Sequence, residues 1–461
     1  MVFPVVGGTQ STGYDVANGF RFNANNSSHF TRSYSATGNR KKFTISVWVK
    51  RSALGENNAV LSASTTNNFN DKIIGFRSSD AIEVNNIASG SDAVQIITNR
   101  LFRDTGAWMH IVLGIDTTQS SIDDGVKLYI NGVREDSYDG TPVYTQDATF
   151  EIGRDGSTTA IGRQQVNSSQ YFDGYIAEMH YVDDAQYDPS YFGETNADGM
   201  WVPKQYTGGH GTTGFFLEFQ QTGTSANSSG KGADTSGNDN HFDDNNADTD
   251  DIVTDTPTNN FCTGSQHARY INDTNVNYNA GNLYLSSPGV ATSYNAVGTL
   301  GSDSMPYYFE VSLANVDQNS DTRVGVVPVT SLANLAINGE HNQVAYRGEG
   351  TVTSTGETSL SSQGNLSDGT ILGVAVDPDN NVKWYLNGSL TSTISINSTY
   401  RGPEYVPYYR HVNSGTSEWN FGNPSFSISS AESDENGFGQ FEYAPPSGYY
   451  ALCTKNLAEY S

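Results

Sequence analysis

Eight histidines are the first residues to examine for catalytic chemistry, because histidine both binds zinc and transfers protons near neutral pH. They are His29, His110, His180, His210, His241, His267, His341 and His411. None belongs to a His-Glu-x-x-His motif or to a close pair with metal-ligand spacing. Residues 229–232, Ser-Gly-Lys-Gly, fail the phosphate-loop pattern, because Gly232 stands where Ser or Thr binds magnesium. Gly-x-Ser-x-Gly is absent too, so the sequence indicates neither zinc catalysis, nucleotide hydrolysis nor a serine hydrolase.

Paired carboxylates are the next candidates, because glycosidases use two acids about 5 to 9.5 Å apart. Some β-sandwich glycosidases carry them on one strand as Glu-x-Asp-x-Glu, and this sequence has no such segment. The nearest cluster, Glu432, Asp434 and Glu435, lies among Ser, Asn and Gly, so we expect a solvated loop. Acids distant in the sequence could still converge, which keeps a glycan depolymerase as an alternative function.

Oxygen-rich loops suit calcium, and one acidic segment resembles a calcium loop in part. Asp244, Asn246 and Asp248 occupy the first three ligand positions, and Asp255 falls at the twelfth. Thr249 replaces the required glycine and the usual closing glutamate is missing. We therefore expect a solvated acidic run, with calcium as a weak alternative and no other cofactor.

Aromatic side chains could form platforms on which sugars stack, because a ring combines an apolar face with a polar edge. Tyr405, Tyr408 and Tyr409 around Pro407, together with the region of Trp201, are the candidates. Burial in a core or a turn is the more common position of such rings. The sequence thus assigns no catalytic, cofactor-binding or metal-ligating residue, and it leaves the ligand-binding residues unknown.

Charge and composition restrict the partners. The 461 residues carry 24 Lys+Arg against 50 Asp+Glu, a formal net charge of 24 − 50 = −26. Such a chain repels nucleic acid and anionic lipid. No stretch is apolar enough for a membrane helix, and the first residues lack the basic and apolar regions of a signal peptide. We expect synthesis in a cytosol, no nucleic-acid partner and no membrane insertion.

The elements that must position these residues are strands. Short runs of β-formers bounded by Gly, Asn, Asp and Ser recur throughout, and helical periodicity is nearly absent. Residues 43–50 alternate as a half-buried strand with Trp48 on the second face. Residues 126–132 and 382–388 read Val-Lys-Leu-Tyr-Ile-Asn-Gly and Val-Lys-Trp-Tyr-Leu-Asn-Gly, and each Asn-Gly predicts a tight hairpin turn. This repetition favours two domains of related architecture, and short runs of this kind are typical of an antiparallel β-sandwich or barrel.

The predicted domain organisation has four parts: residues 1–17 as an N-terminal attachment segment, 18–221 as the first sandwich, 222–279 as an acidic, Asn/Asp/Gly-rich linker and 280–461 as the second sandwich with a tail. Residues 214–219, just before this linker, are expected to form a further strand of the first sandwich. Cys262 and Cys453 are expected to be buried thiols, although one disulfide stays open if both lie in the second domain.

The first half, residues 18–220, resembles the laminin G-like and concanavalin A-like lectin superfamily. The resemblance rests on residues 43–50, 108–112, 128–132, 150–153 and 172–178. It implies a jelly-roll sandwich that often binds glycans or proteins and sometimes calcium. Residues 234–241 look like a stretch, Asp-x-Ser-Gly-Asn-x-Asn-His, that usually lies near the start of such domains but here follows the domain.

The second half, over residues 280–428, resembles a SPRY domain. The matching segments are residues 308–311, 323–326, 373–377, 382–388 and 420–422. The resemblance implies a binding module without catalysis, whose loops at one end of the sandwich bind partners.

The pairing of these two modules resembles virion proteins of tailed phages, many of them marine. Residues 38–42, 255–262 and 446–457 carry this resemblance. It implies a non-enzymatic tail fibre or adhesive appendage, assembled in the host cytoplasm, that binds a host surface glycan or neighbouring virion proteins. A capsid decoration or head-fibre protein is the nearest alternative. A homo-oligomer is compatible with this role, although no heptad pattern predicts a coiled coil.

Overall fold

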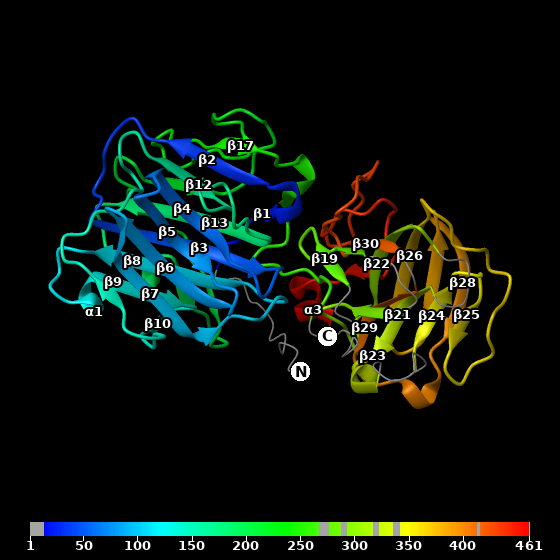
Figure 1. The fold of residues 1–461 in the computed structure, drawn as a ribbon. Coiled ribbons are helices and arrows are strands. Elements are labelled where there is room, and N and C mark those ends of the chain that lie inside the picture. Colours follow the sequence, from blue (N-terminus) through cyan, green and yellow to red (C-terminus); the bar gives the residue numbers. More distant parts are fainter. Residues whose placement is uncertain are drawn as a thin grey trace. The chain divides into compact units, whose positions relative to one another are not determined.

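Two compact units make up the computed structural model, one ending at residue 258 and the other beginning at residue 259. The structure describes residues 13–266, 276–286, 293–316, 322–334, 342–412 and 415–460, so residues 1–12 of the predicted attachment segment lie outside this description. We call the described residues up to 258 the N-terminal unit and the rest the C-terminal unit. The regular secondary structure of both is almost entirely antiparallel strands (Figure 1), which confirms the predicted all-β fold class.

One sheet of the N-terminal unit, sheet I, has the order β10-β9-β8-β3-β13-β1-β18, and β16 also pairs with β13. Its strands are β1 (Gly19–Phe22), β3 (Lys42–Arg51), β8 (Met109–Asp116), β9 (Val126–Ile130), β10 (Val133–Glu135), β13 (Gly174–Asp183), β16 (Phe215–Leu217) and β18 (Ile252–Val253). The presence of β16 confirms the strand expected in residues 214–219.

The other sheet, sheet II, has the order β11-β7-β6-β5-β4-β12-β2-β17. Its strands are β2 (His29–Ser33), β4 (Asn58–Thr66), β5 (Phe69–Phe76), β6 (Ala81–Ala88), β7 (Ser91–Leu101), β11 (Val143–Tyr144), β12 (Thr158–Ile161) and β17 (Asp243–Asn245). A separate two-stranded ribbon consists of β14 (Gly193–Thr195) and β15 (Trp201–Pro203).

Aromatic and branched side chains from sheets I and II form the core of the N-terminal unit. On β3, Phe43 and Val47 contribute to this core, as their alternation predicts. The opposite face of β3 is also covered, because Trp48 is only 4% exposed and packs in a cluster with Val16 and Val253. The predicted half-buried strand is therefore buried on both faces.

Residues 222–258, predicted as part of a linker, belong to the N-terminal unit. β17 pairs with β2 in sheet II, and β18 pairs with β1 in sheet I. Phe242 lies fully buried in the core, and Lys231 forms an ion pair with Asp244 at 2.5 Å. The linker prediction is wrong here. The two strand pairings, one buried aromatic ring and one ion pair offset the entropy lost on ordering this segment, although it has no continuous apolar pattern.

The unusual placement of residues 234–241 also has a structural explanation. The Asp234 carboxylate accepts hydrogen bonds from the backbone N–H groups of Phe216, Ser236 and Asn240. The side chain of Asn240 donates to the carbonyl of Gly214 at 2.7 Å. Although this segment follows the matched strands, it packs against β16 and forms part of the same sandwich.

Both predicted Asn-Gly hairpins are confirmed. Asn131 and Gly132 have φ of 49° and 78°, and Asn387 and Gly388 have φ of 47° and 78°. A turn with two positive φ angles matches the twist of its strands, and Asn and Gly adopt such angles at the lowest cost. Each turn joins two neighbouring strands of one sheet.

The C-terminal unit also has two sheets. Sheet III has the order β19-β20-β30-β22-β26-β27-β28 with β31 beside β22, and sheet IV has the order β21-β29-β23-β24-β25. Sheet III contains β19 (Asn277–Asn279), β20 (Tyr284–Ser286), β22 (Tyr307–Ala314), β26 (Ile371–Asp377), β27 (Asn381–Leu386), β28 (Ser389–Ser395), β30 (Thr416–Asn420) and β31 (Tyr450–Ala451). Sheet IV contains β21 (Ser293–Val297), β23 (Arg323–Pro328), β24 (Val344–Arg347), β25 (Val352–Ser354) and β29 (Tyr405–Val412). Apolar side chains of both sheets share one core.

Helices contribute little to either unit. α1 (Ile122–Gly125) precedes β9, and α3 (Thr454–Tyr460) ends the described chain. In the ranges that the structure describes, no helix has the length and apolar character needed to cross a membrane.

The acidic cluster near residue 434 only partly follows the prediction of a solvated loop. Glu432 and Glu435 are exposed, but Asp434 is 5% exposed. Its carboxylate accepts hydrogen bonds from Ala451 N at 2.8 Å and from Asn456 Nδ2 at 2.7 Å. Asp434 therefore anchors the C-terminal segment rather than facing water.

Cys262 and Cys453 both lie in the C-terminal unit as buried thiols, with no disulfide between them. Burial raises the pKa of the Cys453 thiol to about 12. Both residues therefore act as small core side chains, as expected for buried thiols.

Candidate functional site

A hollow with a volume of about 500 Å³ lies on sheet II of the N-terminal unit. We call it the amide groove; it is lined by Asn67, Asn70, Lys72, Glu83, Asn85, Ile87, Gln164, Val166, Asn167 and Gln170. Its floor comes from β5 and β6, and residues 164–170, between β12 and β13, form one wall. Ile82 and Val84 of β6 lie in the core, so alternation directs Glu83 and Asn85 to the opposite face, where the groove lies.

The wall of the groove is held by backbone geometry and by one serine of β4. Ser62 Oγ donates to the carbonyl of Arg163 at 2.7 Å and accepts from Gln165 N at 2.9 Å. Gln164 N donates to the carbonyl of Ser169 at 2.8 Å and closes the loop on itself. These bonds fix the loop over β4, so its side chains are positioned against β5 before any ligand arrives.

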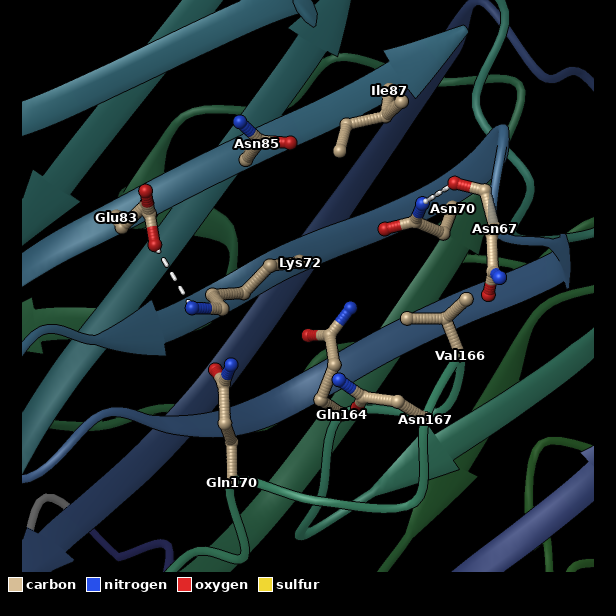
Figure 2. A pocket seen from close by; sticks show the side chains of 10 residues that line it. All are labelled: Asn67, Asn70, Lys72, Glu83, Asn85, Ile87, Gln164, Val166, Asn167 and Gln170. Atoms are coloured by element: carbon tan, nitrogen blue, oxygen red, sulfur yellow. Dashed lines mark hydrogen bonds and ion pairs between the residues drawn. The ribbon is translucent and has the colours of Figure 1, made fainter. Parts of the chain in front are cut away.

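One ion pair crosses the floor of the amide groove. Lys72 Nζ on β5 lies 2.9 Å from Glu83 Oε2 on β6, and Arg77 contacts the other oxygen of Glu83 at 3.4 Å. The amide of Asn70 donates to the carbonyl of Asn67 at 2.7 Å. Figure 2 shows the Lys72–Glu83 ion pair and the Asn70–Asn67 hydrogen bond within the groove. Gln164 and Gln170 extend from the loop toward Lys72.

Two acceptors in the amide groove lack a donor. Gln164 is 5% exposed, yet its Oε1 has no hydrogen-bond donor within the described part of the chain. The same holds for Oε1 of the half-buried Gln170. A buried acceptor without a partner costs about 1 to 3 kcal/mol, so folded proteins rarely keep one without a functional or structural reason.

The lining has a defined chemical character. Six of the ten lining residues are Asn or Gln, each of which can donate and accept hydrogen bonds. Ile87 and Val166 add an apolar contact, and no aromatic ring lines the hollow. Such a surface suits a ligand that carries many hydrogen-bonding groups and only small apolar faces.

Two carboxylates converge near the core of the N-terminal unit, Asp71 and Glu151. Asp71 accepts hydrogen bonds from Asn86 Nδ2 and from Glu151 N at 2.7 and 2.5 Å, and burial raises its pKa to about 7. Glu151 forms ion pairs with Arg40 at 2.6 Å and with Arg154 at 2.8 Å. Both are 0% exposed, so neither carboxylate can reach a glycosidic bond in this conformation.

Two of the histidines meet although they lie 30 positions apart in the sequence. His180 Nδ1 lies 3.1 Å from His210 Nε2, and Phe216 stacks on His180 with a centroid distance of 4.0 Å. Both imidazoles are buried, and burial lowers the pKa of His210 to about 4. Among the described residues, no three metal-ligating side chains come together.

The acidic residues of the resembled calcium loop do not converge. Asp244 pairs with Lys231, and Asp248 caps the short helix η3 (Thr249–Asp251). Asp255 lies 2.8 Å from Lys50 Nζ and accepts a hydrogen bond from Trp108 Nε1 at 2.9 Å. These carboxylates stabilise the fold and do not come together as a calcium-binding loop in this structure.

The three tyrosines considered for a sugar-stacking platform are buried, which is the position the sequence favoured. Tyr405, Tyr408 and Tyr409 are at most 1% exposed and belong to the C-terminal unit's packed interior. Trp201 is half-buried, and its Nε1 donates to His110 Nδ1 at 2.9 Å. The three tyrosines therefore supply packing, as the general tendency of aromatic rings to be buried indicates.

Sequence reasoning did not identify the amide groove. Its residues come from residues 67–72, 83–87 and 164–170, and Asn and Gln are too common in this chain to mark a site. The one available signal was the alternation of polar residues with core residues on β5 and β6, which predicts a polar sheet face but not a hollow.

Comparisons with known proteins agree with this fold. Residues 22–186 match the Laminin_G_3 family model, described as the concanavalin A-like lectin/glucanases superfamily. No curated protein matches the chain. A laminin G-like, concanavalin A-like domain is thus present in the N-terminal unit, as the resemblance implied.

Solved structures show weaker likeness. The SPRY domain of human HERC1 is 14% identical, covers 34% of this chain and 96% of its own, and gives a TM-score of 0.27. A putative carbohydrate binding protein from Bacteroides ovatus is 15% identical, with coverages of 50% and 59% and a TM-score of 0.32. Domains LG4-5 of the mouse laminin alpha1 chain are 9% identical, with coverages of 87% and 84% and a TM-score of 0.31.

Proposed function

We propose that this chain is a non-catalytic virion protein of a tailed phage, a tail fibre or other adhesive appendage that binds a glycan on the host surface. The observation that carries the binding role is the amide groove. It lies in a unit whose residues 22–186 match the concanavalin A-like lectin/glucanases superfamily. The virion role is supported by the pairing of a laminin G-like half with a SPRY-like half, and it implies assembly in the host cytoplasm.

The chemistry of the groove supports a glycan rather than an apolar ligand. Sugar hydroxyls both donate and accept hydrogen bonds, which is the pattern that Asn and Gln side chains match. The apolar contact is limited to Ile87 and Val166, too little for a drug-like or lipid ligand.

The non-catalytic part of the proposal is supported by the state of the buried acids. Asp71 and Glu151, which converge, are fully buried and bonded to protein groups. Glu83 is the one acidic residue among the ten that line the groove, and it forms ion pairs with Lys72 and Arg77. A glycosidase needs a second carboxyl group within about 9.5 Å that faces the same substrate.

The C-terminal unit is proposed to contact other virion proteins, with a homo-oligomer as one form of such contact. This role rests on the SPRY resemblance, which implies partner binding through loops. Deletion of residues 280–461 is then expected to impair assembly of the appendage or adsorption. Particles that assemble and adsorb normally would contradict this part.

Two experiments test the proposed function. Labelled antibody against the chain, viewed on purified particles by electron microscopy, should mark the tail; label on the capsid would make the chain a decoration protein, and unlabelled particles would overturn the virion role. The full chain should also bind immobilised host surface polysaccharide without releasing reducing ends. Release that is lost on Glu83→Gln would instead indicate a depolymerase.

A further inference from the structure

We propose that the amide groove binds several consecutive sugar rings within a glycan chain, laid along β5 and β6, rather than one terminal sugar. This inference rests on the proposed glycan-binding role and names the form of the glycan. It is carried by the length of the groove, by exposed residues at both of its ends and by the different chemistry of those ends.

The length of the groove follows from the strands in its floor. Glu83, Asn85 and Ile87 line it from alternate positions of β6. Since a strand advances about 3.4 Å per residue, the stretch from Glu83 to Ile87 spans about 14 Å. On β5, Asn70 lies opposite Ile87 and Lys72 lies opposite Asn85, so both strands line the same stretch. This span exceeds a single sugar ring, and a volume of about 500 Å³ is typical of pockets that hold ligands of several rings.

Exposed residues lie at both ends of the groove. Figure 2 shows Asn67 and Ile87 toward one end and Lys72 and Glu83 toward the other. Asn67 is exposed, and Arg77, which contacts Glu83 at the other end, has a side chain that is 42% exposed. A glycan chain can therefore continue past the groove in both directions.

The two ends offer different contacts. At the first end, the exposed amide of Asn67 can bond a hydroxyl group, while the half-buried Ile87 and Val166 offer contact to the C–H face of a sugar. At the second end, Lys72 is held by Glu83 and has further N–H donors for ring or hydroxyl oxygens. Separate rings of one chain would meet these two sets of contacts, so a longer chain gains both.

The outer face of sheet II also gives an extended ligand room to lie. In sheet I, β8 and β13 are buried along their whole lengths. On β7 of sheet II, by contrast, Gln95 and Ile97 alternate with the core residues Val94 and Ile96 and are only half-buried. The groove therefore lies on a sheet face that the rest of the N-terminal unit leaves partly exposed.

The test uses the full chain and length series, from monosaccharide to hexasaccharide, prepared from dextran, mannan, galactan and alginate. Isothermal titration calorimetry measures the affinity of the native chain, of the double variant Asn67→Ala with Ile87→Ala, and of the control Asn68→Ala with Ile97→Ala. Asn68 is exposed, Ile97 is half-buried on the outer face of sheet II opposite Glu83, and neither lines the groove.

For at least one series, the affinity should rise at least tenfold from disaccharide to hexasaccharide, and the parent polysaccharide should bind as tightly per hexasaccharide unit. The variant at Asn67 and Ile87 should bind the hexasaccharide at least tenfold more weakly, and the control should match the native chain. Equal affinity for disaccharide and hexasaccharide, or much weaker binding of the polysaccharide, would overturn this inference while leaving the glycan-binding role intact. Absence of binding in every series would overturn both.

Melting temperatures show whether the variants are folded. Each double variant removes one exposed amide and part of one half-buried isoleucine, so the two should melt within a few degrees of each other. If the variant at Asn67 and Ile87 melts much lower, Asn67→Ala alone provides the comparison, because it changes only an exposed side chain. It should weaken hexasaccharide binding at least threefold; unchanged affinity would overturn the inference.

Discussion

Lys50 and Asp255 lie 205 positions apart in the sequence and form a buried ion pair with an Nζ–Oδ2 distance of 2.8 Å. Their side chains are 0% and 2% exposed. Lys50 belongs to β3 at the centre of sheet I, and Asp255 follows β18 at its edge. The pair therefore connects the last part of the N-terminal unit to a central strand of sheet I, and Asp255 also accepts a hydrogen bond from Trp108.

Removal of one partner of this pair should unfold the N-terminal unit more easily. Lys50→Met leaves the Asp255 carboxylate buried without its cation, so we expect a loss of about 3 to 5 kcal/mol in the free energy of unfolding. Guanidinium denaturation followed by tryptophan fluorescence measures this loss. The double variant Lys50→Met with Asp255→Leu should recover part of the stability, because it leaves no unpaired charge; equal losses for the single and double variants would contradict the role of the pair.

The extent of the N-terminal unit can be tested by truncation. A chain ending at residue 258 retains β17, β18, Phe242 and Asp255, whereas a chain ending at residue 221 loses all four. We expect the longer fragment to resist limited proteolysis and the shorter one to be degraded or to aggregate, because its core and both sheet edges would be exposed. Equal resistance of the two fragments would restore the linker interpretation.

The sequence was informative wherever structure is decided by near neighbours. The turn at Asn131 and Gly132 was predictable because two positive φ angles restrict the residues that can form it. The core face of β3 was predictable from the alternation of Phe43, Ile45 and Val47. These features depend on residues within one strand or one turn.

Features that depend on distant contacts were not predictable from the sequence. Residues 243–245 look like a solvated acidic run, but β2 provides the partner that makes them a strand. Trp48 looks exposed by alternation, but segments from both ends of the N-terminal unit cover it. The amide groove combines a loop with two strands about 80 positions away, and its Asn and Gln residues resemble the rest of this polar surface.

His110 should make the N-terminal unit sensitive to acid. Its Nε2 donates to Ser46 Oγ at 2.8 Å while Nδ1 accepts from Trp201, and Trp48 stacks on the ring at 4.6 Å. Burial lowers the pKa of His110 to about 3, so the folded state holds the neutral ring while the unfolded chain takes up a proton below about pH 6.5. The contribution of neutral His110 to the free energy of unfolding is therefore fully present above pH 6.5 and is lost as the pH falls toward 3.

The expected size of this effect is about 2 kcal/mol between pH 6.5 and pH 5. Urea denaturation across this range measures it for the native chain and for His110→Gln. The variant should be less stable at pH 7 but should show a flatter pH dependence, because the titrating group is gone. A slope identical to that of the native chain would assign the acid sensitivity to other groups.

Glu310 should anchor the C-terminal segment to sheet III. It lies fully buried on β22, and its carboxylate accepts hydrogen bonds from Glu442 N at 2.9 Å, Tyr443 N at 2.8 Å and Asn420 Nδ2 at 2.9 Å. Glu310→Ala leaves these donors unpaired, and each buried donor costs about 1 to 3 kcal/mol. We expect faster proteolysis after residue 423. The exposed Glu432→Ala serves as the control and should be cleaved at the native rate.

Removal of divalent cations should leave the stability of the chain unchanged. The carboxylates of the acidic run that resembles a calcium loop already contact protein groups. Asp244 pairs with Lys231, Asp248 caps the N-terminus of η3, and Asp255 pairs with Lys50. A calcium ion would need six to eight oxygen ligands and would have to displace these partners. Melting temperatures in EDTA and in millimolar calcium should therefore agree. A rise of several degrees with calcium, abolished by Asp244→Asn, would show that the loop rearranges around the ion.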